Sequence, residues 1–571
     1  MPNFLQIIFD QLKRADARVV LREIHGEQFV SVTGKELLEQ VQRVRLFLRN
    51  SGVQPGDRCA LLAPNSIRWV VFDLALMAER VIVVPLYSRQ APGELAGMMK
   101  DCEPRLLFVN DVALGGAVAQ AWPVAPRRVV FEEVLKAAMP KTSLAEGLPS
   151  RKDSDLVTII YTSGTSGEPK GVCLNTGNLN YMLERTTERL GRLMGGAKGG
   201  SPDRVFHYLP LNFAASWLLL LSCLTRETTL TLSTDLNKLA NEIRLSSPNY
   251  FLNVPTLLER VRRGVEDALS KRSVPIRWLF QKARAAWQKK TSGRVGALDR
   301  LWLWLGNGLI FSKVRERFGR DLRALICGSA PLAPETQQFF QAMGISVLQA
   351  YGLTETTGIC TMDDPRVPAE PGYVGQAISG SELKIDEGEE IVVRGTHIFS
   401  GYWNRPEETA SVLRDGWFHT GDLGEANARG NWRIIGRVKN LIVLNSGHKV
   451  APETIEEQIA RLLPSAQVVI VGNGRGYLCA LVTGEAAAGE IQSALETVNR
   501  DLPHYRKIRN YKIIPGAFTA ESGLLTANGK IRRDAINARY SAEINAMYDT
   551  RGKRETSEAN DEARAVNRQH A

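Results

Sequence analysis

The sequence has few cysteines and no cysteine motif. Its seven cysteines are scattered along 571 residues, and none of them forms a C-x-x-C pair. An odd, dispersed set does not build a disulfide framework, so it indicates reduced structural thiols in a cytosolic protein. The seven histidines also lack the spacing of metal ligands, so we expect no zinc site.

Long apolar runs are missing as well. The longest strongly apolar patch, residues 217–221 (WLLLL), is far shorter than a bilayer span, so we expect a chain that does not cross a membrane. Charged side chains interrupt the apolar ones in residues 1–21, which argues against the core of a signal peptide. Together with the thiols, this predicts a cytoplasmic protein.

The composition that is present is typical of an ordinary globular protein with enough apolar residues for sizeable cores. Apolar residues make up 44% of the chain and charged residues 23%. A chain of 571 residues is too long for one core, so several domains are expected. The net charge of +11 favours anionic partners such as nucleotides, phosphorylated cofactors, acidic lipids or nucleic acid, without choosing among them.

Helix and strand patterns alternate in the first part of the chain. Residues 34–49 and 67–79 predict helices, and residues 59–62, 81–84 and 106–109 predict strands. Such alternation is typical of a parallel sheet with helices on both faces. The sequence therefore predicts the α/β fold class.

The alternating pattern also suggests domain boundaries. Residues 1–436 predict a large N-terminal domain of layered parallel sheets, which ends in a small β-rich unit at residues 382–435. A small α+β domain is expected over residues 437–545. Residues 546–571 are charged and poor in apolar side chains, so they predict a disordered tail.

One stretch has the composition of a phosphate-binding loop. Residues 161–172 (YTSGTSGEPKGV) directly follow an apolar run that predicts a buried strand. Glycines let backbone NH groups turn toward an anion, hydroxyl groups add donors, and Lys170 adds positive charge. Pro169 before the lysine and Gly171 after it exclude a Walker A loop. The alternative, a polar surface linker, fits poorly with a position directly after a buried strand.

Six stretches, in this order, resemble the adenylate-forming (AMP-binding) superfamily, which includes acyl-CoA synthetases, firefly-type luciferases and peptide-synthetase adenylation domains. They are residues 161–172, 328–331 (GSAP), 351–356 (YGLTET), 417–422 (WFHTGD), 436–439 (GRVK) and 528–530 (NGK). The resemblance covers most of the chain except its charged tail. It implies a two-step reaction in which a carboxylate and ATP give an acyl-adenylate and pyrophosphate, and a thiol then displaces AMP.

The resemblance also implies roles for individual residues. The implied ATP- and AMP-binding residues are Thr162, Ser163, Gly164, Thr165, Lys170, Gly328, Ser329, Ala330, Tyr351, Gly352, Asp422 and Arg437. The implied catalytic residues are Lys530, Thr354 and Glu355, and the implied Mg²⁺ residues are Glu355 and Thr162. Taken singly, each could instead be an ordinary packing, turn or surface residue.

The small domain carries three further implied sites. Lys530 would bridge carboxylate and phosphate during adenylation, because it is a point charge on a flexible stem; a solvated surface lysine is the alternative. Lys439 is the implied hinge about which the small domain swings. Gly447 and His448 would then line the channel for the CoA thiol. The alternative for His448, an ordinary loop residue, has equal weight.

Within the superfamily the chain resembles the long-chain fatty acyl-CoA synthetases, on the basis of residues 311–319 (FSKVRERFG) and the long segment before them. The implied substrates are therefore a fatty acid, ATP and CoA, with Mg²⁺. Phe213 and Trp217 are predicted to line the acyl tunnel, with a buried core helix as the alternative. Residues 174–179 (LNTGNL) and 209–213 (LPLNF) each lack a histidine that long-chain relatives usually carry, which leaves the chain length of the acid open.

Residues 265–310 combine Trp278, Trp287, Trp302 and Trp304 with many lysines and arginines. Such helices suit the surface of an anionic membrane, so a membrane-peripheral position is one expectation. Packed helices with a solvated basic face are the alternative.

Two rival functions differ in their acceptor or class. A fatty acyl-AMP ligase that loads a carrier protein usually has an insertion ahead of the hinge, and none is evident between residues 423 and 437. A basic nucleic-acid-binding protein would show a recognised module, so we expect no nucleic-acid partner. The sequence thus predicts an AMP-forming long-chain fatty acid–CoA ligase and leaves its oligomeric state open.

Overall fold

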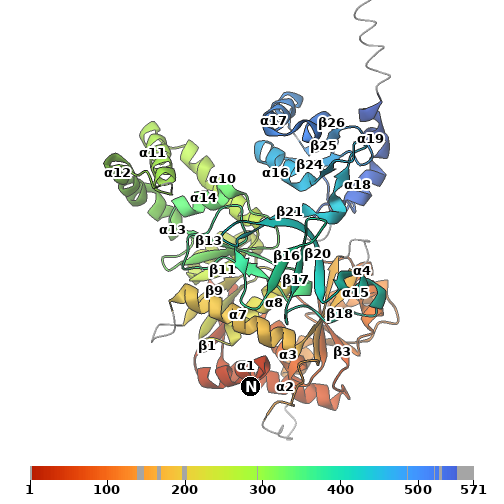
Figure 1. The fold of residues 1–571 in the computed structure, drawn as a ribbon. Coiled ribbons are helices and arrows are strands. Elements are labelled where there is room, and N and C mark those ends of the chain that lie inside the picture. The colour runs from red at the N-terminus through yellow and green to blue at the C-terminus, as the bar shows by residue number, and fades with distance from the viewer. Residues whose placement is uncertain are drawn as a thin grey trace, which may run out of the picture. The chain divides into compact units, whose positions relative to one another are not determined.

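The structure is a computed structural model that describes residues 3–137, 147–163, 169–195, 202–291, 293–484, 486–519, 521–525 and 530–549. The chain forms two compact units (Figure 1). The large unit comprises Met1–Asp386, Ile391–Thr420 and Glu425–Ile434. The small unit comprises Glu387–Glu390, Gly421–Gly424 and Ile435–Ala571.

The first sheet of the large unit has nine strands. Its six central strands pair in parallel, and antiparallel strands close both edges. In sheet order they are β15 (Gln376–Ala377), β14 (Thr361–Met362), β13 (Ser346–Tyr351), β12 (Ala324–Cys327), β11 (Tyr250–Asn253), β9 (Asp203–His207), β10 (Thr228–Ser233), β1 (Val19–His25) and β2 (Gln28–Thr33).

The second sheet of the large unit has seven strands and the same mixed character. Its parallel part ends at β7, which forms an antiparallel hairpin with β8. In sheet order the strands are β18 (Gly401–Tyr402), β8 (Pro169–Asn175), β7 (Leu156–Ser163), β4 (Ile82–Leu86), β3 (Arg58–Leu62), β5 (Leu106–Val109) and β6 (Arg127–Val130).

Successive residues of these strands face different helical layers. In β3, Cys59 and Leu61 join the core that the two large sheets share, whereas Ala60 and Leu62 join a core on the other face. This follows from the two-residue period of a strand. The shared core contains α1 (Phe4–Ala15), α2 (Gly34–Asn50), α3 (Ile67–Ala78), α6 (Phe131–Lys136), α7 (Thr176–Met194) and α8 (Ala214–Leu224).

The outer faces of both sheets are covered by helices of their own. On the seven-stranded sheet these are α4 (Pro92–Cys102) and α5 (Val112–Ala121). On the nine-stranded sheet they are α9 (Leu239–Ser246), α10 (Pro255–Ser270), α11 (Val274–Thr291), α12 (Ala297–Gly306), the π-helix η2 (Asn307–Phe311), α13 (Ser312–Glu316) and α14 (Pro334–Ala342). The short turn η1 (Leu236–Lys238) precedes α9. Parallel sheets layered with helices confirm the predicted α/β fold class.

A third sheet of five strands lies in the range predicted to be β-rich. Its strands are β16 (Glu382–Ile385), β17 (Glu390–Arg394), β20 (Trp417–Ala426), β19 (Leu413–Arg414) and β21 (Trp432–Arg437). Two short helical elements lie nearby in the sequence. The turn η3 (Thr354–Thr356) lies between β13 and β14, and the helix α15 (Pro406–Val412) lies between β18 and β19.

The small unit has a three-stranded sheet between two cores. In β24, Val468 and Ile470 join one core, and Val469 and Val471 join the other. Its elements are η4 (Val438–Asn440), β22 (Ile442–Val443), β23 (Lys449–Val450), α16 (Pro452–Leu462), β24 (Ala466–Val471), β25 (Leu478–Gly484), α17 (Ala488–Asp501), η5 (His504–Arg506), β26 (Ile508–Ile514), α18 (Arg533–Arg539) and α19 (Ser541–Tyr548). This is the α+β composition expected of the small domain.

All seven cysteines are buried free thiols. In the part of the chain that the structure describes, no helix combines the length and the apolar character needed to cross a membrane. The structure also has elements that the sequence did not predict, among them the helix α1 and the hairpin of β1 and β2.

Candidate active site

The stretch predicted to bind phosphate, residues 161–172, covers the end of β7 and the start of β8, which pair as an antiparallel hairpin. Thr162 lies opposite Lys170, and the backbone of Ser163 lies opposite Pro169. The hairpin leaves no room beside Gly171, because a Cβ atom there would lie 2.6 Å from a methyl group of Ile159. The turn itself, with the predicted residues Gly164 and Thr165, lies outside the described residues.

Lys170 is held by an anionic and an aromatic partner. Its ammonium forms an ion pair with Glu408, in the first turn of α15, and lies 5.3 Å from the centre of the Tyr402 ring. Both contacts favour a cation at this position. The ammonium is thereby kept at the hairpin, where an incoming phosphate would compete with the Glu408 carboxylate.

Glu355 is oriented by the same tyrosine. The Tyr402 hydroxyl donates a hydrogen bond of 2.9 Å to Glu355 Oε1, and the peptide NH of Phe399 donates to the Glu355 carbonyl. Burial and the neighbouring Glu355 raise the pKa of Tyr402, so its hydroxyl stays a neutral donor. An oriented carboxylate of this kind is a suitable ligand for Mg²⁺. Thr162, the other residue predicted to hold the metal, lies opposite Lys170 in the hairpin.

Asp101 of α4 braces this corner of the large unit. Its carboxylate accepts a hydrogen bond of 2.6 Å from Tyr161 and forms an ion pair of 3.0 Å with Arg405. Its carbonyl accepts a hydrogen bond from the indole of Trp403. The hairpin and the segment that carries Tyr402 are therefore fastened to one helix.

A tight turn leads from β13 to Glu355. Gly352 is required there, because a Cβ atom would lie 2.5 Å from the Gly358 carbonyl oxygen and 2.5 Å from Ile359 Cα. The Leu353 carbonyl accepts the peptide NH of Gly358, and Thr357 adopts a left-handed φ of 53°. Thr354 and Glu355 thus follow Tyr351 within one short, closed turn.

The residues predicted to hold adenine lie at the carboxyl ends of two neighbouring parallel strands. Gly328 follows β12, and Tyr351 ends β13, which pairs with β12. Ligands of open α/β sheets bind beyond such strand ends. Ser329 and Ala330 are exposed there, and Ser329 has a left-handed φ of 71°.

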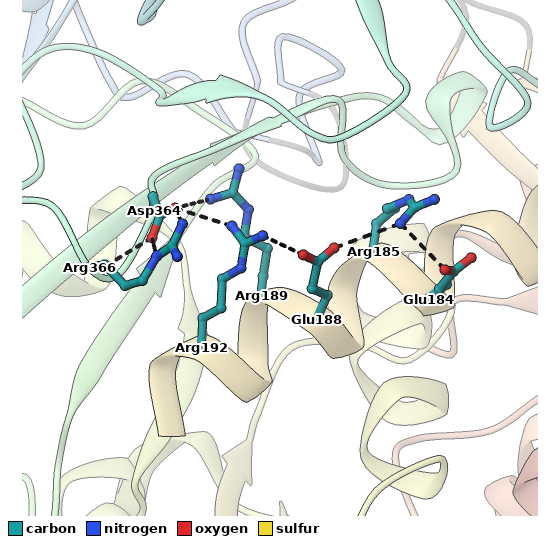
Figure 2. Close-up of polar contacts among 7 residues, drawn as sticks. All are labelled: Glu184, Arg185, Glu188, Arg189, Arg192, Asp364 and Arg366. Carbon is teal, nitrogen blue, oxygen red and sulfur yellow. Dashed lines mark hydrogen bonds and ion pairs between the residues drawn. The ribbon is translucent and has the colours of Figure 1, made fainter. Parts of the chain in front are cut away.

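A charge cluster links the elements that carry the two predicted subsites. Arg189 and Arg192 of α7 lie 3.3 and 3.2 Å from the Asp364 carboxylate, which Arg366 also contacts at 2.7 Å (Figure 2). Hydrogen bonds from Arg366 lower the pKa of Asp364 most, so the carboxylate is ionised. Because α7 follows β8 and Asp364 follows β14, which pairs with β13, the cluster joins elements that adjoin the predicted phosphate and adenine subsites.

Asp422 and Arg437, the predicted ribose residues, form an ion pair in the small unit. Arg437 Nε lies 2.6 Å from Asp422 Oδ1, and Asp422 is only 2% exposed. The preceding residue, Gly421, has a φ of 71° and donates its NH to Glu390. The pair therefore has a fixed position at the start of the small unit.

The hinge, channel and catalytic residues predicted in the small unit have different environments. Burial lowers the pKa of the hinge candidate Lys439, and nearby Arg437 adds to this effect. His448 Nδ1 lies 3.0 Å from Ser446 Oγ, and its ring stacks on Tyr505. Between them, Gly447 has a left-handed φ of 80°. Lys530 is exposed; Thr526, Ala527, Asn528 and Gly529 before it lie outside the described residues.

The two residues predicted for the acyl tunnel differ in environment. Phe213 is half-buried before α8, and its ring centre is 6.0 Å from that of Tyr87. Trp217 is buried in the core, where its indole NH donates a 2.8 Å hydrogen bond to Asp73. The buried-helix alternative thus describes the position of Trp217, whereas its role toward an acyl chain stays a prediction.

Both departures from the long-chain pattern have local structural roles. Asn175 and Asn178, from the first, exchange hydrogen bonds and cap α7. Residues 209–211, from the second, are held by Asn65, whose side chain bonds the Leu209 carbonyl and the Leu211 NH.

Sequence reasoning did not anticipate Tyr402, Glu408, Asp101 or Asn65. These residues stand in no motif recognised along the chain, and their contacts are distant in sequence: Tyr402 is 47 positions from Glu355, Asn65 is 146 from Leu211, and Asp101 is 302 from Trp403. The proline that precedes two glutamates at residues 406–408 was the available signal for α15.

Comparison with known proteins matches two family profiles. The profile of the AMP-binding enzymes matches residues 9–403, and that of the AMP-binding enzyme C-terminal domain matches residues 439–552. The long-chain-fatty-acid–CoA ligase FadD15 of Mycobacterium bovis is 27% identical, over 96% of this chain and 97% of that protein. Long chain acyl-CoA synthetase 3 of Arabidopsis thaliana is 27% identical, over 91% of this chain and 87% of that protein.

Solved structures show the same fold. O-succinylbenzoate coenzyme A synthetase of Bacillus subtilis, in complex with ATP and a magnesium ion, superimposes with a TM-score of 0.72 at 20% identity. The match covers 94% of this chain and 99% of that chain.

Proposed function

The chain belongs to the AMP-binding enzyme family, and from this premise we propose that it joins a long-chain fatty acid to CoA, with ATP converted to AMP and pyrophosphate. Its coarser activity is that of an adenylate-forming acid–thiol ligase. The long-chain acid is supported by the names of the relatives at 27% identity. ATP and Mg²⁺ are supported by the complex of the related synthetase.

One observation carries the proposal: Tyr402 connects the cation and the carboxylate that adenylation needs. Its ring lies beside the Lys170 ammonium, and its hydroxyl donates to Glu355. A cation and a carboxylate that contact the same tyrosine side chain are suitably placed for a triphosphate and its Mg²⁺: the cation can bind phosphate oxygens, and the carboxylate can bind the metal.

In the first step, an oxygen of the fatty acid carboxylate attacks the α-phosphorus, and the bond to the pyrophosphate oxygen breaks. Lys170, Thr162 and the loop of Ser163, Gly164 and Thr165 would hold the departing pyrophosphate. Glu355 with Thr162 would hold Mg²⁺, whose charge offsets that of the phosphates. Preorganised donors and charges at such a centre lower the barrier, because they need no rearrangement during the reaction.

The nucleotide would be held by the residues that the resemblance implies for ATP and AMP binding. Tyr351 with Gly328, Ser329, Ala330 and Gly352 would bind adenine. The Asp422 carboxylate would accept hydrogen bonds from the ribose hydroxyls, and Arg437 would donate to the same sugar. Thr354 would contact the α-phosphate. Ionised partners of this kind make shorter and stronger hydrogen bonds than neutral ones.

In the second step, the CoA thiolate attacks the acyl carbonyl, and AMP leaves with its phosphate oxygen. Thiols have an ordinary pKa of about 8.5, so the demand on a base is modest. A swing of the small unit about Lys439 would move Lys530 away from the reacting phosphate. The same swing would bring Gly447 and His448 to the channel for the CoA thiol. Phe213 and Trp217 would contact or support the acyl chain.

The decisive experiment separates the two half-reactions. The full-length protein with palmitate, ATP, Mg²⁺ and CoA is expected to release AMP and pyrophosphate and to form palmitoyl-CoA. We expect Lys530→Ala to slow adenylation by a factor on the order of 100 or more, because it removes a charge at the reacting phosphate. The variant should still convert supplied palmitoyl-adenylate and CoA to thioester, followed by mass spectrometry.

Lys512→Ala, an exposed lysine of the same unit, is the matched control and should leave both half-reactions unchanged. Equal loss of both half-reactions in Lys530→Ala would contradict the assigned role. A panel of acids of increasing length then fixes the substrate, and an acyl carrier protein offered in place of CoA fixes the acceptor.

A further inference from the structure

The positive charge of this protein is concentrated in one helical segment. Residues 271–320 contain thirteen lysines and arginines but only two acidic residues, which gives a net charge of +11. The whole chain, with 72 basic and 61 acidic residues, also has a net charge of +11. Outside the segment, the chain therefore has 59 residues of each sign and no net charge.

The same segment exposes large apolar side chains. Trp304 is 71% exposed, Leu298 70% and Val274 65%, and Trp278, Leu301 and Leu309 are exposed as well. Single exposed apolar residues are ordinary, whereas a cluster of this kind marks an interaction surface. Figure 1 shows α11 and α12, which carry most of the cluster, beyond α10 and α14 at the edge of the large unit.

Helix α12 has apolar side chains on two faces. Trp302 and Leu305 pack against the core of the nine-stranded sheet. Leu298, Leu301 and Trp304 recur at every third position and are exposed. The outer face of a surface helix is normally polar, so an exposed apolar stripe on the side of α12 away from the core is unusual.

The exposure does not come from loose packing. Trp278 and Trp302 meet edge to face at 4.9 Å between ring centres, and Lys289 forms a 3.1 Å ion pair with Asp299. Gly306 brings the two helices so close that a Cβ atom there would lie 2.5 Å from Ala283 Cβ. The pair of α11 and α12 is therefore a firm platform for its exposed side chains.

We propose that α11 and α12 dock on the surface of an anionic phospholipid bilayer. Tryptophan and leucine enter the boundary between headgroups and acyl chains, while lysine and arginine pair with anionic headgroups. The platform provides both, with the Lys282 ammonium 5.5 Å from the Trp278 ring centre at the border between them. This docking goes beyond the proposed reaction, and it would place the enzyme at a reservoir of long-chain acids.

Sedimentation with vesicles tests the docking. The full-length protein is expected to bind vesicles of phosphatidylcholine with phosphatidylglycerol, to bind phosphatidylcholine alone much less, and to dissociate as salt screens the charges. Trp304→Ser with Leu301→Ser should lower the partition coefficient about tenfold or more, because the apolar anchors are lost. Replacing Lys290, Arg294 and Arg300 by Ser should lower it about fivefold for each removed charge at low salt.

A matched variant removes the same charge elsewhere. Lys13, Lys35 and Lys152 are exposed outside the platform, and replacing all three by Ser should leave vesicle binding nearly unchanged. All variants should keep the wild-type circular dichroism spectrum and melting curve. If the protein accepts a short, water-soluble acid, all variants should also turn it over at the wild-type rate. Vesicle binding that is equal in the wild type and the platform variants would overturn the proposal. So would a surface that binds only DNA, or one that holds two copies of the chain together without binding vesicles.

Discussion

At the residue scale, the candidate site depends on a tyrosine that belongs to none of the recognised motifs. Tyr402 contacts both Lys170 and Glu355, so it connects the predicted phosphate-binding cation with the predicted metal-binding carboxylate. Composition and motif predicted the cation and the carboxylate. The tyrosine could not be predicted, because β18 brings it to β8 only in the folded sheet.

Tyr402→Phe isolates the hydroxyl of this residue. The ring beside Lys170 remains, whereas Glu355 loses a hydrogen bond to a charged group, typically about 1.5–3 kcal/mol. We expect the Mg²⁺ concentration for half-maximal adenylation to rise about tenfold, with a smaller change in the KM for the acid. Pyrophosphate release measured against Mg²⁺ concentration checks this.

The matched change is Tyr511→Phe, which removes a phenol that bonds the Ala488 carbonyl in the small unit. It should leave the Mg²⁺ dependence unchanged. If Tyr402→Phe also keeps the wild-type dependence, Glu355 does not need this hydrogen bond to hold the metal.

At the element scale, the turn after β13 positions three predicted residues at once. Tyr351, Thr354 and Glu355 lie on either side of Gly352, and the chain returns so closely that no side chain fits there. The motif at residues 351–356 predicted the role of these residues but not the reason for the glycine. That reason lies in Gly358 and Ile359, which only the folded turn brings beside it.

Gly352→Ala is therefore expected to destabilise the large unit by about 1–3 kcal/mol, the usual cost of overpacking. It should also slow adenylation, because Tyr351 and Glu355 move with the turn. Gly97→Ala in α4 is the matched control: its Cβ atom meets nothing within 4 Å. That change should stabilise by about 0.5–1 kcal/mol, since alanine favours a helix. Urea unfolding followed by circular dichroism measures both, and equal effects of the two would contradict the steric argument.

At the scale of the whole molecule, the fold class could be predicted from the sequence, whereas the contacts between distant parts of the chain could not. Alternating helix and strand patterns are local, so they could be recognised and they led to the layered parallel sheets. Contacts such as Arg189 with Asp364 or Trp217 with Asp73 join residues far apart in the chain, and no local pattern encodes them. The N-terminal hairpin of β1 and β2 was missed for a related reason, because β1 is completed by pairing with β10.

The buried carboxyl of Asp73 makes the stability of the large unit depend on pH. Burial raises the pKa of Asp73 to about 7, from an ordinary value of 3.8. Between these values the folded protein binds a proton that the unfolded chain releases. The stability from this group is therefore full below pH 3.8 and is lost as the pH rises through about 7, by at most about 1.4 kcal/mol per pH unit.

Asp73→Asn removes this titration and leaves an oxygen that can accept the indole NH of Trp217. Relative to the wild type, the variant should gain stability as the pH rises from about 4 to 7, because an amide never ionises. Urea unfolding at several pH values measures the difference. Asp363, whose pKa burial also raises to about 7, is present in both proteins and largely cancels from it. Asp267→Asn, at an exposed position of α10, should run parallel to the wild type at every pH. A constant difference between Asp73→Asn and the wild type would show that Asp73 is ionised in the folded protein, so that its bond to Trp217 would join an anion and a donor inside the core.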